Sequence, residues 1–276
     1  MIIIRLIGGL GNQLFQIQYA KNIALGGDSK IKIDDSFLKQ SNKAHEVLGI
    51  PDIESSFERL TLSFFTLKII RPFEKFLLKT KLHKYFKYRK FFFESENISG
   101  IKKNFILDGF WQDKRWINQN FIDSIRRIID KNNKTIKISS RENVICMHIR
   151  RGDYLTNKRW FRLQQHVLDI SYYERAIEYF LKLSPLNKFH IFTDDENWAK
   201  LNFKNDRFEI INSKNLTPFD LLSKMSLYKD FIIANSTLSW WAAVLSKSIN
   251  KTVVLPMLWG KSVDSDRYAL DGWIKL

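Results

Sequence analysis

Short apolar runs alternate with longer amphipathic stretches along the second half of the chain. Each run has the length and composition of a buried strand and is followed by polar or turn-forming residues. The predicted strands cover residues 144–148, 189–193, 208–212, 231–234 and 252–255, and Pro256 ends the last of them. Strands that alternate with helices through short loops predict a parallel, doubly wound α/β sheet.

Helix start signals stand between these strands. Ser171 and Glu174 have the spacing of a capping box, which predicts a helix from there to about residue 183. Thr217 followed by Pro218 predicts a helix that reaches about residue 226. A third helix is expected over residues 238–246.

The first half of the chain is less regular but has the same alternation. Its predicted elements are strands at 2–7, 30–34 and 105–110, helices at about 12–24 and 114–130, and a basic helical insertion. The polar run 130–134 predicts a linker. We therefore expect two Rossmann-like α/β domains facing a cleft. Residues 1–135 would form the first and residues 136–276 the second.

The chain is strongly basic, with 45 Lys and Arg against 29 Asp and Glu and a net charge of +16. Such a charge favours anionic partners: nucleic acid, phosphorylated substrates or a membrane surface. In residues 64–93, lysines and arginines alternate with aromatic residues. An ordinary surface helix pair and a patch that docks on anionic lipid both explain this segment. No other feature resembles a nucleic-acid module, so no nucleic-acid partner is expected.

Several classes of protein are disfavoured by what the sequence lacks. No stretch approaches the roughly 20 apolar residues that a membrane span needs. The single cysteine, Cys146, rules out an internal disulfide framework and is expected to be a buried, inert thiol. The first residues predict a core strand and not a signal peptide. We therefore expect a cytoplasmic protein, with peripheral contact to the inner face of the plasma membrane through residues 64–93.

Two adjacent arginines follow the strand that ends at His148. Arg150 and Arg151 stand, with Asp153, at the carboxyl end of a strand, where open α/β sheets bind ligands. Guanidinium groups stay charged and bind phosphate oxygens in pairs. This arrangement suits a site that holds a diphosphate without a metal. A strand end followed by a solvated charge cluster is the simpler alternative.

Two further groups follow the neighbouring predicted strands. Asn235, Ser236 and Thr237 precede a helix, whose first N–H groups and dipole can bind an anion. Asp194 and Asp195 end another strand, where their carboxylates can bind a ribose or a base edge. An ordinary N-cap and a capped turn are the alternatives. Because all these strands end at one edge of a sheet, the groups can converge on one nucleotide diphosphate.

Two other motifs carry weaker signals. Gly8, Gly9 and Gly11 predict a tight strand-to-helix turn, but Leu14 stands where a dinucleotide-binding turn has its third glycine. Asp264-Ser265-Asp266 resembles a metal-binding Asp-x-Asp motif, but it follows the last clear strand without a partner motif. We expect it to be a solvated loop and predict no metal site.

Five segments taken together resemble the bacterial α-1,2-fucosyltransferases of glycosyltransferase family 11. They are GGLGNQLFQ (8–16), GFWQD (109–113), HIRRGDY (148–154), FTDD (192–195) and NSTLSWWAA (235–243). Their order and spacing match that family from residue 3 to about residue 256. The HxRRxD pattern alone is shared with α-1,6- and protein O-fucosyltransferases.

This resemblance implies a GT-B fold, GDP-β-L-fucose as donor, inversion at the anomeric carbon, and neither metal nor cofactor. It places Arg150 on the diphosphate, Asp194 or Asp195 at the guanosine, and Ser236 with Thr237 at the β-phosphate. Asn12 would lie near the acceptor. Arg151, Asn235, Gly9 and Gly11 complete the expected donor-binding set.

The expected reaction moves L-fucose to the 2-hydroxyl of a terminal galactose in a surface glycan, such as an O-antigen or lipid-linked oligosaccharide. A different linkage such as α-1,6, or a non-enzymatic basic binder, are the alternatives. The catalytic base stays unassigned, because a loose transition state needs little help from one. Its candidates are the carboxylates Asp34, Asp108, Asp113 and Asp153, of which Asp153 could instead brace the arginines. His148 is either a proton carrier or a structural hydrogen-bond donor.

Overall fold

The computed structural model describes residues 1–24, 30–36, 38, 50, 53, 57–60, 76, 80, 90–92, 105–132, 143–156 and 167–276. The chain divides into two compact units, Met1–Phe121 and Ile122–Leu276. The division falls within helix α4 (Gln119–Asn132), so the start of the run predicted as a linker is helical. The predicted domain boundary at 135/136 lies outside the described residues.

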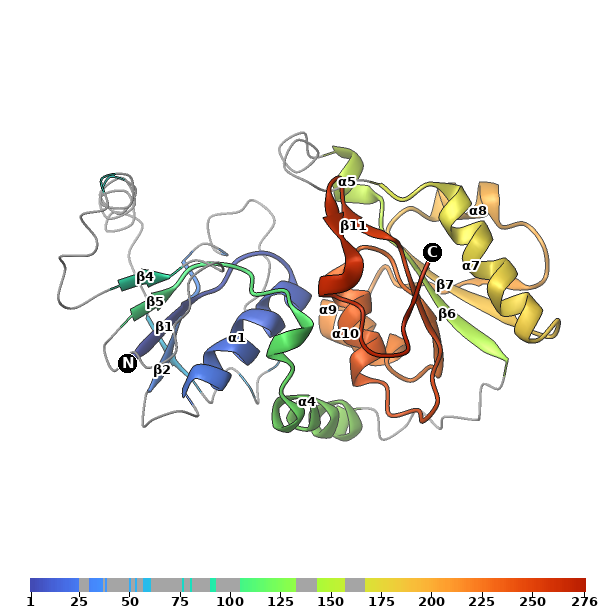
Figure 1. Cartoon of the computed structure of the whole chain (residues 1–276). Helices are drawn as coiled ribbons and strands as arrows, with labels where there is room; N and C mark the ends of the chain where they lie inside the picture. Colours follow the sequence, from blue (N-terminus) through green and yellow to red (C-terminus); the bar gives the residue numbers. More distant parts are fainter. Residues whose placement is uncertain are drawn as a thin grey trace. The chain divides into compact units, whose positions relative to one another are not determined.

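The first unit is built on a parallel five-stranded sheet in the order β3-β2-β1-β5-β4 (Figure 1). Its strands are β1 (Ile2–Arg5), β2 (Ile31–Asp34), β3 (Glu58–Arg59), β4 (Lys90–Phe92) and β5 (Phe105–Leu107). From β1 the chain runs outward to β3 and then returns to the other side of β1. The strand order therefore reverses between β1 and β5.

Helix α1 (Leu10–Ala24) is buried around most of its circumference. Two of its buried amides bond to the neighbouring loops: Gln13 Nε2 donates to the Gly8 carbonyl at 2.9 Å, and Gln16 Nε2 to the Gly109 carbonyl at 3.0 Å. Buried amides need such partners, since an unpaired one costs about 1–3 kcal/mol. These bonds hold the loops after β1 and β5 against α1.

The second unit is built on a parallel six-stranded sheet in the order β13-β10-β9-β6-β7-β8. Its strands are β6 (Val144–Ile149), β7 (Lys188–Thr193), β8 (Phe208–Ile210), β9 (Asp230–Ile232), β10 (Val253–Leu255) and β13 (Ile274–Lys275). The chain winds from β6 to β8 and then crosses to the other side of β6. The predicted doubly wound parallel sheet is confirmed, with its order reversing between β6 and β9.

Helices connect these strands, and three of them were predicted from the sequence: α7 (Ile170–Leu183), α9 (Pro218–Met225) and α10 (Thr237–Leu245). Two shorter helices were not predicted, α5 (Gly152–Thr156) and α8 (Glu196–Asn202). Thr217 and Asp220 form a reciprocal capping box at α9, and Pro218 begins that helix as predicted. The capping box predicted at Ser171 is wrong. Helix α7 begins one residue earlier, after Asp169, and has no side-chain cap.

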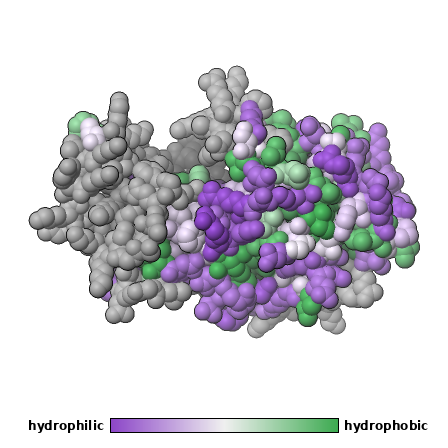
Figure 2. All heavy atoms as spheres, viewed as in Figure 1, coloured by the Kyte–Doolittle hydropathy of each residue, from purple (hydrophilic) through white to green (hydrophobic). Residues whose placement is uncertain are grey.

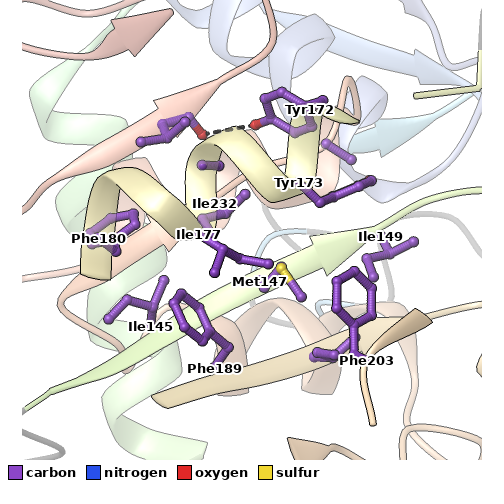
Figure 3. Packing of buried hydrophobic residues seen from close by; sticks show 14 of the residues in the cluster. Ile145, Met147, Ile149, Tyr172, Tyr173, Ile177, Phe180, Phe189, Phe203 and Ile232 are labelled. Carbon is purple, nitrogen blue, oxygen red and sulfur yellow. Dashed lines mark hydrogen bonds between the residues drawn. The ribbon is translucent and has the colours of Figure 1, made fainter. Parts of the chain in front are cut away.

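The core of the second unit lies between α7 and the sheet (Figure 3). Ile145, Met147 and Ile149 of β6 point toward α7, because side chains alternate between the two faces of a strand. The Tyr172 hydroxyl donates to the Ile233 carbonyl at 2.6 Å and so ties the helix to the end of β9. Cys146, which alternates with these residues, is buried, as expected.

Pro256 ends β10 as predicted, but β10 is not the last strand. A hairpin of β11 (Leu258–Gly260) and β12 (Val263–Asp264) follows, and β13 then pairs in parallel with β10. Asp264 caps the short 3₁₀ helix η3 (Ser265–Arg267) by accepting from Asp266 N at 2.7 Å. Lys275 pairs with both Asp264 and Asp266. The Asp-x-Asp sequence is thus an exposed helix cap that also binds the final strand.

The surface of the second unit mixes hydrophilic and hydrophobic residues on the face that Figure 2 shows. In the described part of the chain, no helix is both long and apolar enough to cross a membrane. Most of the basic segment 64–93 lies outside the described residues. Its predicted membrane contact therefore stays a prediction.

Candidate functional site

The groups predicted to bind a diphosphate lie at the ends of three adjacent strands. Strand β6 lies between β9 and β7, and all three are parallel. Their carboxyl ends therefore share one edge, at the point where strand order reverses. Open α/β sheets bind ligands at such points. Arg150 follows β6, Asp194 follows β7, and Asn235 lies three positions after the end of β9.

Arg150 is fixed beside the end of β7. Its Nη1 lies 2.9 Å from Asp194 Oδ2, and its guanidinium lies 5.9 Å from the ring centre of Tyr154. About one third of the side chain, 33%, is exposed to solvent. The guanidinium is thus held in place and can still be reached by a ligand.

Arg151 contacts both a carboxylate and an aromatic ring. Its Nε lies 3.3 Å from Asp195 Oδ2, and its guanidinium stacks 4.2 Å from the ring centre of Trp198. Asp195 also caps α8 by accepting from Trp198 N at 3.1 Å. Both aspartates predicted to face a nucleoside are therefore bonded to the arginine pair.

The loop after β9 is tied to its surroundings through Asn235. The Tyr154 hydroxyl donates to the Asn235 carbonyl at 3.0 Å, which joins the loops after β6 and β9. Asn235 Nδ2 donates to the Trp259 carbonyl of β11 at 3.1 Å. Ser236 is the N-cap residue of α10, although its side chain makes no capping bond, and Thr237 begins the helix. The positive end of the α10 dipole thus lies at this edge of the sheet.

His148 is buried below the arginines, on the face of β6 opposite α7. Burial, followed by the nearby charge of Arg150, lowers its pKa from 6.5 to about 4, so the ring is neutral at pH 7. Its carbonyl accepts from the Tyr173 hydroxyl at 3.5 Å. Nδ1 is buried and has no hydrogen-bond partner among the described residues. Asp153 lies in α5, but its side chain is outside the described part of the structure.

A second reversal of strand order lies in the first unit, between β1 and β5. Gly8 follows β1 with a φ of +78°, and a β-carbon there would lie 2.2 Å from Asn12 Nδ2. Asn12 Oδ1 accepts from Gln112 Nε2 at 2.8 Å, so the first turn of α1 meets the loop after β5. Gly9 has open space around its Cα, and Gly11 is buried in the first turn of α1.

Gln112 was not singled out from the sequence, although it lies within the GFWQD segment. It follows Trp111, which has a φ of +47°, a backbone conformation that is strained for an aromatic residue. The Trp111 ring is buried and stacks on Tyr19 with ring centres 4.8 Å apart. This packing holds the strained turn and directs the following amide toward Asn12.

The carboxylates considered as bases in the first unit differ in exposure. Asp34 is buried between Arg5, at 3.0 Å from its Nε, and Ser36. Asp113 is buried, caps the short helix η2 (Lys114–Trp116) and pairs with Arg115. Asp108 lies 3.0 Å from Arg5 Nη1, and 26% of its side chain is exposed. Among these three, Asp108 is the carboxylate that solvent reaches.

A metal site is not evident in the described residues. No three His, Cys, Asp or Glu side chains come together in that part of the chain. The positive groups at the edge of the second sheet are the arginines and the start of α10.

Two doubly wound parallel sheets, one with arginines where its strand order reverses, give a GT-B-like α/β architecture. The chain matches the model of glycosyl transferase family 11 over residues 1–275 and belongs to that family. It is 30% identical to the O-antigen biosynthesis glycosyltransferase WbnK of Escherichia coli over 303 aligned positions, which cover 98% of this chain and 99% of WbnK. An alpha-1,2-colitosyltransferase of Escherichia coli is 29% identical over 278 positions, covering 94% and 92% of the two chains.

A solved structure supports the fold alone. The family 9 glycosyl transferase from Veillonella parvula matches with a TM-score of 0.50 at 9% identity, covering 100% of this chain and 86% of that one. The resemblance to family 11 and the expected α/β fold are thereby confirmed.

Proposed function

We propose that this glycosyltransferase moves L-fucose from GDP-β-L-fucose to the 2-hydroxyl of a terminal galactose in a bacterial surface glycan, with inversion. One observation carries the donor assignment. Arg150 is partly exposed at the carboxyl end of β6, and α10 begins at the same edge of the second sheet, where the strand order reverses. A guanidinium and a helix N-terminus together bind the oxygens of a diphosphate.

The same groups account for the chemical step. The acceptor hydroxyl oxygen bonds to the anomeric carbon while the bond from that carbon to the β-phosphate breaks. The electron pair of the broken bond leaves with GDP, and the sugar inverts. Arg150, with Ser236 and Thr237 at the start of α10, would stabilise the negative charge that develops on the β-phosphate. One such fixed donor is worth about 3–4 kcal/mol in a transition state. We propose that these groups take the place of a metal ion in stabilising the leaving group.

On the acceptor side, we propose that Asn12 binds a sugar hydroxyl. Gln112 accounts for its orientation by donating to Asn12 Oδ1, which directs Nδ2 as a donor. The acceptor proton passes to a carboxylate or to water. Asp108 is the partly exposed candidate in the first unit, and Asp153 remains a candidate in α5. Gly9 and Gly11 would bring the backbone close to the ligand.

A second donor follows from one of the relatives, which is named as a colitosyltransferase. Colitose is the 3-deoxy counterpart of L-fucose, so the two GDP-sugars share the diphosphate and differ at one hydroxyl. Turnover of GDP-fucose and GDP-colitose at equal concentration would decide between them. The main proposal predicts the larger kcat/KM with GDP-fucose.

The donor site is tested by calorimetric titration with GDP. Arg150→Ala should weaken GDP binding at least tenfold, because a hydrogen bond to a charged group is worth about 1.5–3 kcal/mol. Arg175→Ala, an exposed arginine on α7, removes the same charge elsewhere on the unit and should leave the affinity unchanged. Equal losses in both variants would indicate binding to general positive charge and would contradict the proposed site.

A further inference from the structure

The two oxygens of the Asp194 carboxylate contact two different groups, one in Arg150 and one in Arg151. Oδ2 lies 2.9 Å from Arg150 Nη1, and Oδ1 accepts from the backbone N–H of Arg151 at 2.8 Å. One side chain thus binds both the guanidinium and the backbone that carries it. The carboxylate therefore restrains the arginine at both ends.

Strand register brings these residues together. Ile149 of β6 is the parallel partner of Thr193 in β7, so Arg150 and Asp194 each follow one member of the last pair. Gly152 leaves the room for the contact. A β-carbon at that position would lie 3.0 Å from Asp194 Oδ2 and 3.2 Å from its Cγ. The glycine between the arginines and Asp153 is therefore part of the same arrangement.

This ion pair restrains the side chain of Arg150 more than it stabilises the folded protein. The side chains of Arg150 and Asp194 are 33% and 25% exposed, and pairs in contact with water contribute little to folding. A free arginine side chain loses much of its rotamer entropy when a ligand fixes it. If that entropy is lost before the ligand arrives, binding is tighter and the transition state meets a fixed charge.

We propose that Asp194 is a positioning residue, which orients Arg150 toward the diphosphate and does not recognise the nucleoside. This inference rests on the proposed function and gives Asp194 a different role from the one expected from the sequence, in which Asp194 or Asp195 faces the guanosine. Asp195, which pairs with Arg151 and caps α8 by accepting from Trp198 N, supports the second arginine in the same way.

The test compares GDP with guanosine as ligands of Asp194→Asn, using inhibition of transfer and calorimetry. An asparagine keeps the shape and an acceptor for Arg151 N–H but loses the charge that holds Arg150. We expect GDP affinity to fall about tenfold and kcat to fall with it, while guanosine affinity stays constant. Gly152→Ala keeps the charge of Asp194 but displaces its carboxylate. It should therefore also lower the affinity for GDP relative to that for guanosine. Asp206→Asn, an exposed aspartate before β8, is the control and should change nothing.

A double-mutant cycle separates positioning from a structural role. Arg150→Ala should weaken GDP binding much less in the Asp194→Asn background than in the wild type, because the two residues act as one unit. A thermal unfolding midpoint close to the wild-type value shows that the fold is kept. Equal losses of GDP and guanosine affinity in Asp194→Asn, or additive losses in the cycle, would overturn the inference. A wild-type protein that binds neither ligand would instead overturn the proposed function.

Discussion

Gly8 shows how a single residue determines the position of a candidate acceptor group. Its φ of +78° lies in the region that β-carbons disfavour, and its missing side chain leaves space for Asn12. Gly8→Ala should destabilise the protein by about 1–2 kcal/mol and displace the Asn12 amide. Denaturant unfolding and the KM for acceptor measure the two effects.

Gly272 provides the matched control for this prediction. Its φ of +79° is as unfavourable for a side chain as that of Gly8, but a β-carbon there would meet nothing within 4 Å. Gly272→Ala should therefore lower stability by a similar amount and leave the acceptor KM close to the wild-type value. If both variants raise the acceptor KM equally, or neither does, the close approach of Asn12 to Gly8 has no effect on acceptor binding.

His148 is expected to make stability depend on pH. Its pKa is about 4 in the folded protein and 6.5 as a free side chain, so between these values the unfolded chain binds more protons. Stability therefore rises with pH across this window and is lost as pH falls from 6.5 toward 4. Denaturant unfolding at pH 7.5 and 5 should show a smaller pH difference in His148→Asn than in the wild type. An equal difference would show that His148 can be protonated in the folded protein.

The arginines, aspartates and glycines of the candidate site could be predicted from the sequence, but Gln112 and the bonds between these residues could not. Arginines and aspartates after strands, and glycines in a turn, are visible as types at positions. That Asp194 binds Arg150, or that Gln112 binds Asn12, depends on strand register and on the strained turn at Trp111. These are tertiary features with no local pattern.

At the scale of elements, α4 is joined to the C-terminal end of α10. Arg126 donates to the carbonyls of Val244, Leu245 and Ser246 at 3.0–3.1 Å. Lys251 Nζ donates to the carbonyls of Ala243 and Ser246. The last carbonyls of a helix lack partners within it, and cations there also interact well with its dipole.

Arg126→Ala should therefore lower the free energy of unfolding by about 1.5–3 kcal/mol, because bonds to a charged donor are lost from buried carbonyls. Arg127→Ala removes an exposed arginine from the same helix and should cost less than about 0.5 kcal/mol. Denaturant unfolding of both variants measures the difference. Similar values would show that the contact with α10 adds no stability.

Regular elements were predictable and irregular ones were not. The long apolar strands and the capping box at Thr217 have strong local signals, and the structure has both. The strand β13 has only two residues and no period to detect, yet its pairing with β10 completes the sheet. Ser171 carries a capping pattern, but Asp169 precedes the helix and Ser171 lies within its first turn.

For the whole molecule, the net charge of +16 and the basic segment 64–93 lead us to propose peripheral binding to anionic lipid. Sedimentation with vesicles containing phosphatidylglycerol should retain the protein at low salt and release it as salt rises. Replacing the lysines and arginines of this segment by glutamine should abolish retention without changing GDP affinity. Retention by vesicles of neutral phosphatidylcholine alone would contradict an electrostatic contact.

The proposed function specifies the donor, the linkage and transfer without a metal. All three are tested by transfer of labelled fucose from GDP-fucose to lactose and to a type-1 disaccharide in the presence of EDTA, followed by linkage analysis. We predict an α-1,2-linked product on galactose that forms equally well with and without the chelator. A product with another linkage, loss of transfer in EDTA, or no transfer together with no GDP binding would contradict it.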